Sequence, residues 1–99
     1  MTASALRLTR RAYEDLKNIA RFTRRQWGEA QRRRYLAALG ARLHWRAEYP
    51  QLGKHRPDVA EGYYCFPQGA HLIFYQMNER GGIDIIGVLH QQMDPAHQL

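Results

Sequence analysis

The chain has 99 residues and a mass of 11.6 kDa, which allows one domain with a modest core and excludes a separate cofactor-binding domain. We therefore predict a single domain over residues 1–99. A hydrophobic content of 44% excludes a disordered basic tail. The single cysteine, Cys65, excludes an intramolecular disulfide and any zinc site built on several cysteines. No 18-residue apolar run and no signal-peptide core is present, so we expect a cytoplasmic protein without membrane contact.

The net charge of +6 is distributed unevenly along the chain. Residues 1–50 hold 12 basic and 4 acidic side chains, whereas residues 51–99 hold 3 basic and 5 acidic ones. Eleven of the twelve basic residues in the first half are arginines, which favour bidentate contacts with carboxylates or phosphates. An acidic protein partner, nucleic acid and a merely solvated helix surface all remain possible explanations of this charge.

The first half of the chain predicts a short strand and two helices. Residues 5–8 alternate as a strand does, and Thr9 follows as the expected N-cap of a helix. Apolar residues spaced by three and four then predict a helix that ends at Gly28. A second helix is expected from residue 29 or 30 to about Tyr49, because Pro50 cannot continue it. With so short a connection, the two helices must form an antiparallel hairpin.

The second half predicts a loop and three strands. Residues 50–62 contain two prolines and two glycines and are expected to form a loop that carries a basic cluster at residues 54–56. Strands are predicted over residues 62–66, 71–77 and 83–90, joined by turns at residues 67–70 and 78–82. The last strand is almost entirely apolar and is expected to lie inside the sheet.

The order β-α-α-β-β-β predicts an α+β fold, in which the helical hairpin packs on one face of an antiparallel sheet. Apolar residues of both helices are expected to pack on this sheet: Leu16, Ile19, Leu36, Leu39 and Leu43 against Ile73, Tyr75, Ile85 and Val88. The large aromatic residues Trp27, Tyr35 and Trp45 exceed what two helices on one sheet can easily bury. Some of them are expected to line an exposed groove for a partner.

Several short sequence signatures follow one another in a characteristic order along nearly the whole chain. They are Leu8-Thr9, Asp15-Leu16 with Ile19, Trp27-Gly28 with Gln31 and Tyr35, Tyr49-Pro50 with Gly53, Arg56-Pro57, Glu61-Gly62-Tyr63, residues 71–75, Val88-Leu89-His90, and Met93-Asp94-Pro95. In this order and spacing they resemble the ParE branch of the ParE/RelE toxin superfamily.

The resemblance implies a toxin of a type II toxin–antitoxin system. It implies a ParD-like antitoxin partner with a flexible, acidic C-terminal segment, and DNA gyrase as a target that the toxin inhibits by binding. DNA would then be contacted only indirectly, through the antitoxin. No cofactor and no metal is expected.

Two positions depart from the pattern of the superfamily. Many relatives carry arginine where this chain has Tyr64, and arginine where it has Gln92. In RelE-like ribonucleases the arginines of this sheet stabilise phosphate charge during cleavage. Their absence disfavours an enzyme, although two alternatives remain. One is a ribosome-dependent endoribonuclease that uses Lys54, Arg56 and His71, and the other is a non-toxic relative that acts only within the antitoxin complex.

Two sets of binding residues follow from these considerations. The target is expected to contact Tyr64 and the C-terminal residues His90, Gln92, Met93 and Asp94. The antitoxin is expected to contact the basic helical hairpin through Arg21, Arg24, Arg25, Trp27, Arg32, Arg33, Arg34 and Tyr35. Acidic residues of a flexible partner would pair with these arginines, which explains the uneven charge without nucleic acid.

Overall fold

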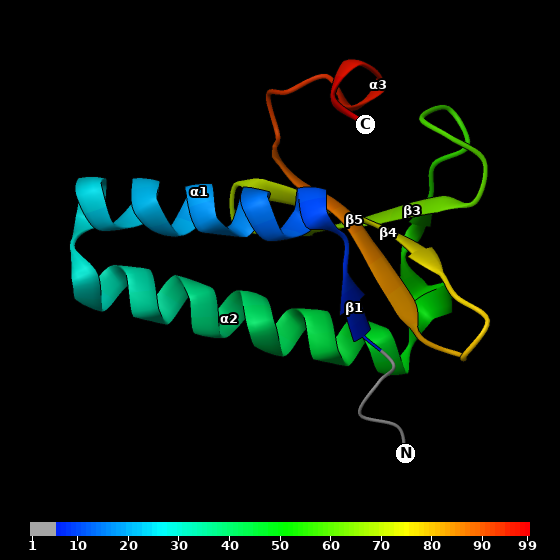
Figure 1. The fold of residues 1–99 in the computed structure, drawn as a ribbon, viewed down its shortest axis with the longest axis horizontal. Helices are drawn as coiled ribbons and strands as arrows, with labels where there is room; N and C mark the ends of the chain where they lie inside the picture. The colour runs from blue at the N-terminus through cyan, green and yellow to red at the C-terminus, as the bar shows by residue number, and fades with distance from the viewer. Residues whose placement is uncertain (1–5) are drawn as a thin grey trace.

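The computed structural model describes residues 6–99, so Ala5 of the predicted first strand lies outside the described residues. The elements along the chain are β1 (Leu6–Leu8), α1 (Arg10–Trp27), α2 (Glu29–Glu48), the 3-10 turn η2 (Pro50–Leu52), β2 (Lys54–His55), β3 (Tyr63–Gln68), β4 (His71–Met77), β5 (Ile83–His90) and α3 (Pro95–Gln98). Figure 1 shows α1 and α2 side by side as a hairpin whose closed end reaches beyond the strands.

The predicted helical hairpin is confirmed, together with its boundaries. The Thr9 hydroxyl accepts a hydrogen bond from the Ala12 N–H at 3.1 Å and so caps α1, as expected of an N-cap threonine. Gly28 separates the helices with φ of 94°, a backbone conformation that residues with a side chain rarely adopt. One glycine can therefore reverse the chain, which places α2 antiparallel to α1.

The sheet has the order β1-β5-β4-β3-β2, which confirms the α+β fold class. Strands β2 to β5 are antiparallel, whereas β1 pairs with β5 in parallel. The sequence prediction did not foresee this parallel pair, because β1 and β5 are separated by most of the chain. Strand β5 lies between β1 and β4, so the prediction that it is an interior strand is confirmed.

The main core fills the space between the helical hairpin and the sheet. Ile19, Leu39 and Leu43 of the helices are buried against Ile73, Tyr75, Ile85 and Val88, while Leu16 and Leu36 pack at its margin. The predicted contacts between the helices and the sheet are thus confirmed. Burial of this apolar surface is the main force that holds the hairpin on the sheet.

A second, smaller core lies on the opposite face of the sheet. It comprises Cys65, Phe74 and Leu89, and both Val59 of the loop and the C-terminal Leu99 pack against it. Figure 1 shows the C-terminal helix α3 folded back beside β5. The C-terminal residues therefore belong to the folded structure and are not a free tail.

Three details of the second half differ from the prediction. Residues 50–62, which were expected to form a loop, contain η2 and the edge strand β2, and residues 95–98, for which no element was predicted, form α3. Strand β3 extends to Gln68, so the turn comprises only Gly69 and Ala70. Pro67 is tolerated in β3 because β2 pairs only with Tyr64 and Cys65, so no strand within residues 6–99 needs an N–H from the outer edge at Pro67.

Candidate functional site

An apolar groove of about 460 Å³ lies between α1 and the end of β5, and we call it the α1–β5 groove. Its walls come from α1, the start of α2, the β3–β4 turn, β5 and the segment after β5. The lining residues are Asp15, Asn18, Ile19, Phe22, Thr23, Trp27, Gln31, Tyr35, Ala70, His71, Val88, His90 and Met93. This groove is of the size that binds a few side chains of a partner.

Three large apolar side chains line the groove without being buried by the fold. Phe22 is 57% exposed, Trp27 is 70% exposed and Met93 is 44% exposed. A cluster of exposed apolar side chains on one surface is typical of a protein interaction site. The prediction that large aromatic residues line a groove is therefore confirmed for Trp27 and Tyr35, whereas Trp45 lies elsewhere on α2.

Tyr35 and two histidines form a polar part of the groove lining. The Tyr35 hydroxyl donates to the Gln68 carbonyl at 2.9 Å and lies 2.7 Å from Nδ1 of His71. A hydroxyl that donates its single proton to Gln68 accepts from His71 in the tautomer that carries the proton on Nδ1. The rings of His71 and His90 meet edge to face, with centroids 5.7 Å apart. Burial, and secondarily the neighbouring His90, lowers the pKa of His71, so its neutral form is favoured.

Asp15 anchors the α1 side of the groove to β5. Its carboxylate accepts a hydrogen bond from the Val88 N–H at 2.9 Å and forms an ion pair with Arg11 at 3.0 Å. The Thr9 hydroxyl lies 2.8 Å from the carbonyl of Ile85. Strand β1 ends at Leu8, so side chains of α1 and its cap satisfy the next polar groups along the edge of β5.

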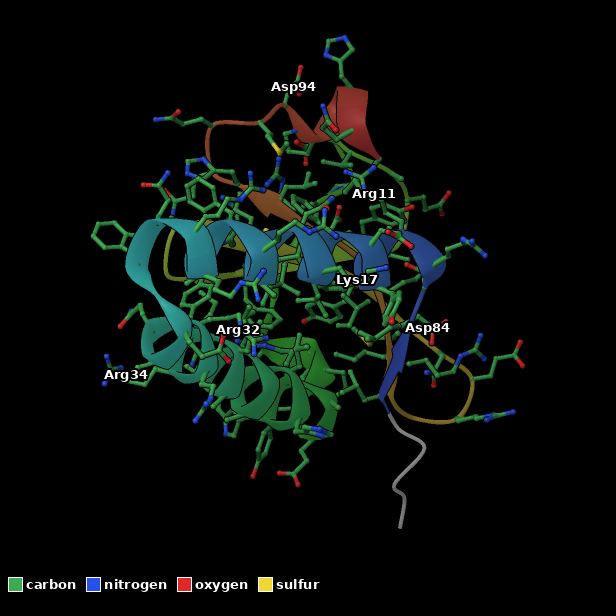
Figure 2. The ribbon with its side chains drawn as sticks, turned by 60° about the vertical axis from the view of Figure 1, so that its left-hand side comes forward. Arg11, Lys17, Arg32, Arg34, Asp84 and Asp94 are labelled. Carbon is green, nitrogen blue, oxygen red and sulfur yellow. The ribbon has the colours of Figure 1, made fainter. Side chains whose placement is uncertain are left out.

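The predicted basic residues lie along the outer surface of the helical hairpin. Arg21, Arg24 and Arg25 are exposed on the last turns of α1, next to Phe22 and Trp27. Arg32 and Arg33 both pair with Glu29 of their own helix, and Arg34 donates to Gln31. Figure 2 shows Arg32 and Arg34 at the start of α2, on the other side of α1 from Asp94. Both helices also contribute residues to the groove lining, Phe22 and Trp27 from α1 and Gln31 and Tyr35 from α2, so both arginine sets flank groove residues in the sequence.

The structure brings only some of the predicted target residues together. His90 and Met93 line the α1–β5 groove, and the exposed Gln92 and Asp94 adjoin them in the segment before α3. Tyr64 lies near the other end of the sheet, because it pairs with Tyr75 whereas His90 pairs with His71. Its ring packs between His55 and Tyr75, with centroid distances of 4.9 and 5.7 Å.

The three residues of the ribonuclease alternative do not meet in one site. Arg56 lies over the ring of Phe74 and pairs with Asp58, on the face of the sheet that holds the second core. His71 contacts Tyr35 on the face covered by the helices. Lys54 of β2 stands opposite Cys65 of β3 in the strand register, so the side chain of Lys54 is on the same face of the sheet as Arg56. General acid–base cleavage needs its groups around one reacting phosphate, and this arrangement does not supply that.

Phe22 and Asn18 are groove residues that sequence reasoning missed. Both lie outside the apolar stripe that packs on the sheet, but they are four residues apart and therefore share one face of α1. This spacing was the available signal. Within residues 6–99, no three His, Cys, Asp or Glu side chains gather closely enough to hold a metal ion. The helices in this part of the chain are also too short or too polar to cross a membrane.

Comparison with known proteins identifies the family. Residues 6–95 match the family described as "ParE toxin of type II toxin-antitoxin system, parDE". The chain is 36% identical to "Toxin ParE1" of Caulobacter vibrioides over 93 residues, which cover 94% of this chain and 95% of that protein. It is 33% identical to "Toxin ParE1" of Mycobacterium tuberculosis over 88 residues, or 89% and 90% of the two chains.

The fold agrees with this assignment. A chain of the structure entitled "Chromosomal ParDE TA system from P. aeruginosa" superposes with a TM-score of 0.75 at 16% sequence identity, and the match covers 87% of this chain and 94% of that one. The family match spans both helices and all five strands of the sheet. The chain therefore belongs to the ParE toxin family of type II toxin–antitoxin systems.

Proposed function

We propose that this chain is a cytoplasmic toxin that inhibits DNA gyrase by binding it and is neutralised by a cognate ParD-like antitoxin. Membership of the ParE family is the observation that carries this proposal. The separation of Lys54, Arg56 and His71 over two faces of the sheet supports binding over RNA cleavage. DNA would be contacted only through the antitoxin.

We further propose that target and antitoxin share the α1–β5 groove. Its apolar wall holds Phe22 together with Trp27, which belongs to the expected antitoxin surface of the hairpin, and its other wall holds His90 and Met93 of the expected target surface. An apolar segment of the antitoxin seated between these walls would cover both surfaces. Neutralisation would then follow from direct occlusion of the target-binding residues, without a conformational change in the toxin.

The charge around the groove suits an acidic partner. Arg24 and Arg25 lie in the last turn of α1, within a few residues of Trp27. Acidic side chains that flank an apolar anchor would approach these arginines while the anchor fills the groove. Such charges at the rim of an interface raise the association rate and make it dependent on salt. The groove itself supplies the buried apolar contacts that limit dissociation.

A supercoiling assay tests the proposed target. Purified, antitoxin-free protein is added to DNA gyrase with ATP and relaxed plasmid, after circular dichroism has shown that the protein is folded. The proposal predicts loss of supercoiling together with trapped, cleaved plasmid, and restoration of supercoiling when antitoxin is added first. Full supercoiling in the presence of folded protein would contradict the proposal. Cleavage of mRNA in a parallel ribosome assay would then identify the RelE-like alternative.

A further inference from the structure

A buried arginine without a polar partner lies toward the C-terminal end of α2, about three helical turns along the helix from Tyr35 of the α1–β5 groove. Arg46 is only 5% exposed, and its Nε and one terminal nitrogen have no hydrogen-bond partner within residues 6–99. Its guanidinium lies between two aromatic rings, 4.8 Å from the centroid of Trp45 and 4.6 Å from that of Phe66. Cation–π contacts offset part of the cost of burying the charge, but they leave the N–H donors unsatisfied.

A second arginine, Arg42, lies one helical turn before Arg46 on α2 and also has a buried nitrogen without a hydrogen-bond partner within residues 6–99. Arg42 is half-buried, its Nε also lacks a partner, and its guanidinium lies 5.4 Å from the centroid of Trp45 and 5.9 Å from that of Phe66. No carboxylate within residues 6–99 forms a salt bridge with Arg42 or Arg46. Two neighbouring cations are thus held together without the anion that such a pair normally has.

The electrostatics of the pair agree with a missing anion. Burial lowers the pKa of Arg46, and the positive charge of Arg42 lowers it further, whereas Tyr75 acts in the opposite direction. An arginine nevertheless stays charged at neutral pH. The folded chain therefore retains a buried charge that an apolar side chain of similar size would replace at a gain in stability.

We propose that Arg42 and Arg46 bind a carboxylate of an acidic peptide segment, which belongs to the same antitoxin that fills the α1–β5 groove. This assignment of the occupant rests on the proposed function, whereas the anion site itself does not. The surroundings favour a peptide, because Trp45 and Tyr49 are 41% and 43% exposed beside the pair and offer apolar contacts to neighbouring residues of the segment.

The adjoining edge of the sheet also accommodates a peptide. Strand β2 covers β3 only at Tyr64 and Cys65, so no other strand within residues 6–99 covers the edge from Phe66 to Gln68, where Pro67 offers a carbonyl but no N–H. An extended segment along this edge would pass Arg42 and Arg46. Nucleic acid fits less well, since its affinity depends on many phosphate contacts along a path, and the neighbours of this pair are aromatic rings in place of further cations.

The first test separates a binding role from a structural one. If Arg46 awaits an anion, Arg46→Met removes an uncompensated buried charge, so the urea midpoint of the free protein should rise. If the arginine is a structural element of the core, the midpoint should fall, and that result would overturn the proposal. Arg80→Met, at an exposed position in the turn between β4 and β5, serves as the control and should leave the midpoint unchanged.

The second test measures binding at the site with a defined probe. In a Trp27→Phe background Trp45 is the only tryptophan, so its fluorescence reports on the Arg42–Arg46 pair. An amidated peptide of alternating Glu and Leu should change this fluorescence saturably, whereas the same peptide with Gln for Glu should not. Arg46→Met should weaken binding by about 10-fold or more, as expected for loss of a charge-assisted hydrogen bond, while Arg80→Met should bind as well as the parent.

The possible outcomes distinguish this site from the proposed function. Absence of a response to the Glu peptide, or an equal response to the Gln peptide, would overturn the anion site. A stronger response to a single-stranded oligo-dT would assign the site to nucleic acid and overturn the peptide proposal. If the Glu peptide binds but gyrase is not inhibited, the anion site stands and the proposed target fails. If the purified antitoxin binds Arg46→Met as tightly as the parent, the assignment of the occupant fails.

Discussion

The carboxylate of Asp15 on α1 accepts a hydrogen bond from the backbone N–H of Val88 on β5, at 2.9 Å. A helix side chain thus takes the place that a strand would occupy, because β1 ends at Leu8 and covers only the first part of β5. The same contact fixes the separation of α1 from the end of β5. It therefore sets the width of the α1–β5 groove, which Asp15 and Val88 both line.

Replacement of Asp15 should destabilise the fold measurably. Asp15→Ala leaves the Val88 N–H without its acceptor and Arg11 without its ion-pair partner, and we expect the free energy of unfolding to fall by about 1–3 kcal/mol. Asp15→Asn retains an acceptor oxygen and should lose less. Urea denaturation of the two variants checks this order. Equal stability of Asp15→Ala and the parent would show that the contact contributes nothing.

Two glycines should respond in opposite directions to substitution by alanine. A methyl group at Gly53 would overlap the hydroxyl of Tyr75, which is buried and donates to the Pro50 carbonyl at 2.6 Å. We expect Gly53→Ala to destabilise by about 1–3 kcal/mol, as overpacking does. Gly40 lies within α2, and no atom of residues 6–99 beyond its own helix lies within 4 Å of where a Cβ would be, so Gly40→Ala should stabilise by about 0.5–1 kcal/mol. Thermal denaturation measures the stability of both variants. A lower stability of both than of the parent would contradict the expected opposite effects.

Stability should fall in mild acid because of His71. Its pKa is lowered in the folded chain, mainly by burial, whereas in the unfolded chain it lies near the ordinary value of about 6.5. The unfolded chain thus binds a proton more readily, so the stability that neutral His71 contributes is complete above about pH 6.5 and is lost as the pH falls toward the folded pKa.

A matched pair of variants isolates this contribution. We expect the free energy of unfolding to change less between assays at about pH 7.5 and about pH 5.5 in His71→Asn than in the parent. His44→Asn removes an exposed histidine of α2 and should retain the pH dependence of the parent. An unchanged difference in His71→Asn would exclude His71 as the source of the effect.

The local order of the chain was predictable from its sequence to a large extent. The periodic apolar residues of α1 and α2, the cap at Thr9 and the break at Gly28 gave the hairpin, because each of these signals acts within a few residues. Runs rich in β-branched and aromatic residues, bounded by turn residues, predicted β4 and β5 in the same way. The elements that were missed are η2, β2 and α3, which are only two to four residues long and depend on tertiary contacts.

The site was less predictable, because it depends on contacts between distant segments. The parallel pairing of β1 with β5 and the role of Asp15 at Val88 both join residues more than 70 positions apart. The burial of Arg46 could not be foreseen either, since arginine in a helix is normally solvated. Aromatic residues beyond the capacity of the core did predict a groove, and Trp27 and Tyr35 line it.

Groove variants should lose affinity for the antitoxin. Phe22→Ser removes an exposed aromatic ring from the α1 wall without touching the buried core, so the fold should persist while the dissociation constant rises about 10-fold or more. Leu52→Ser is the matched control, because Leu52 is 56% exposed and lies in η2, away from the groove. Isothermal titration calorimetry with purified antitoxin measures both dissociation constants. An equal loss of affinity in the two variants would show that the groove is not part of the interface.

The shared groove is tested most directly by measuring gyrase inhibition and antitoxin affinity for one variant, Met93→Ser. Met93 lies on the wall opposite Phe22 and is 44% exposed, so its replacement should leave the fold intact. We predict that Met93→Ser weakens both gyrase inhibition and antitoxin binding, whereas Leu52→Ser weakens neither. Full gyrase inhibition by a Met93→Ser protein that no longer binds the antitoxin would show that the two partners use separate surfaces.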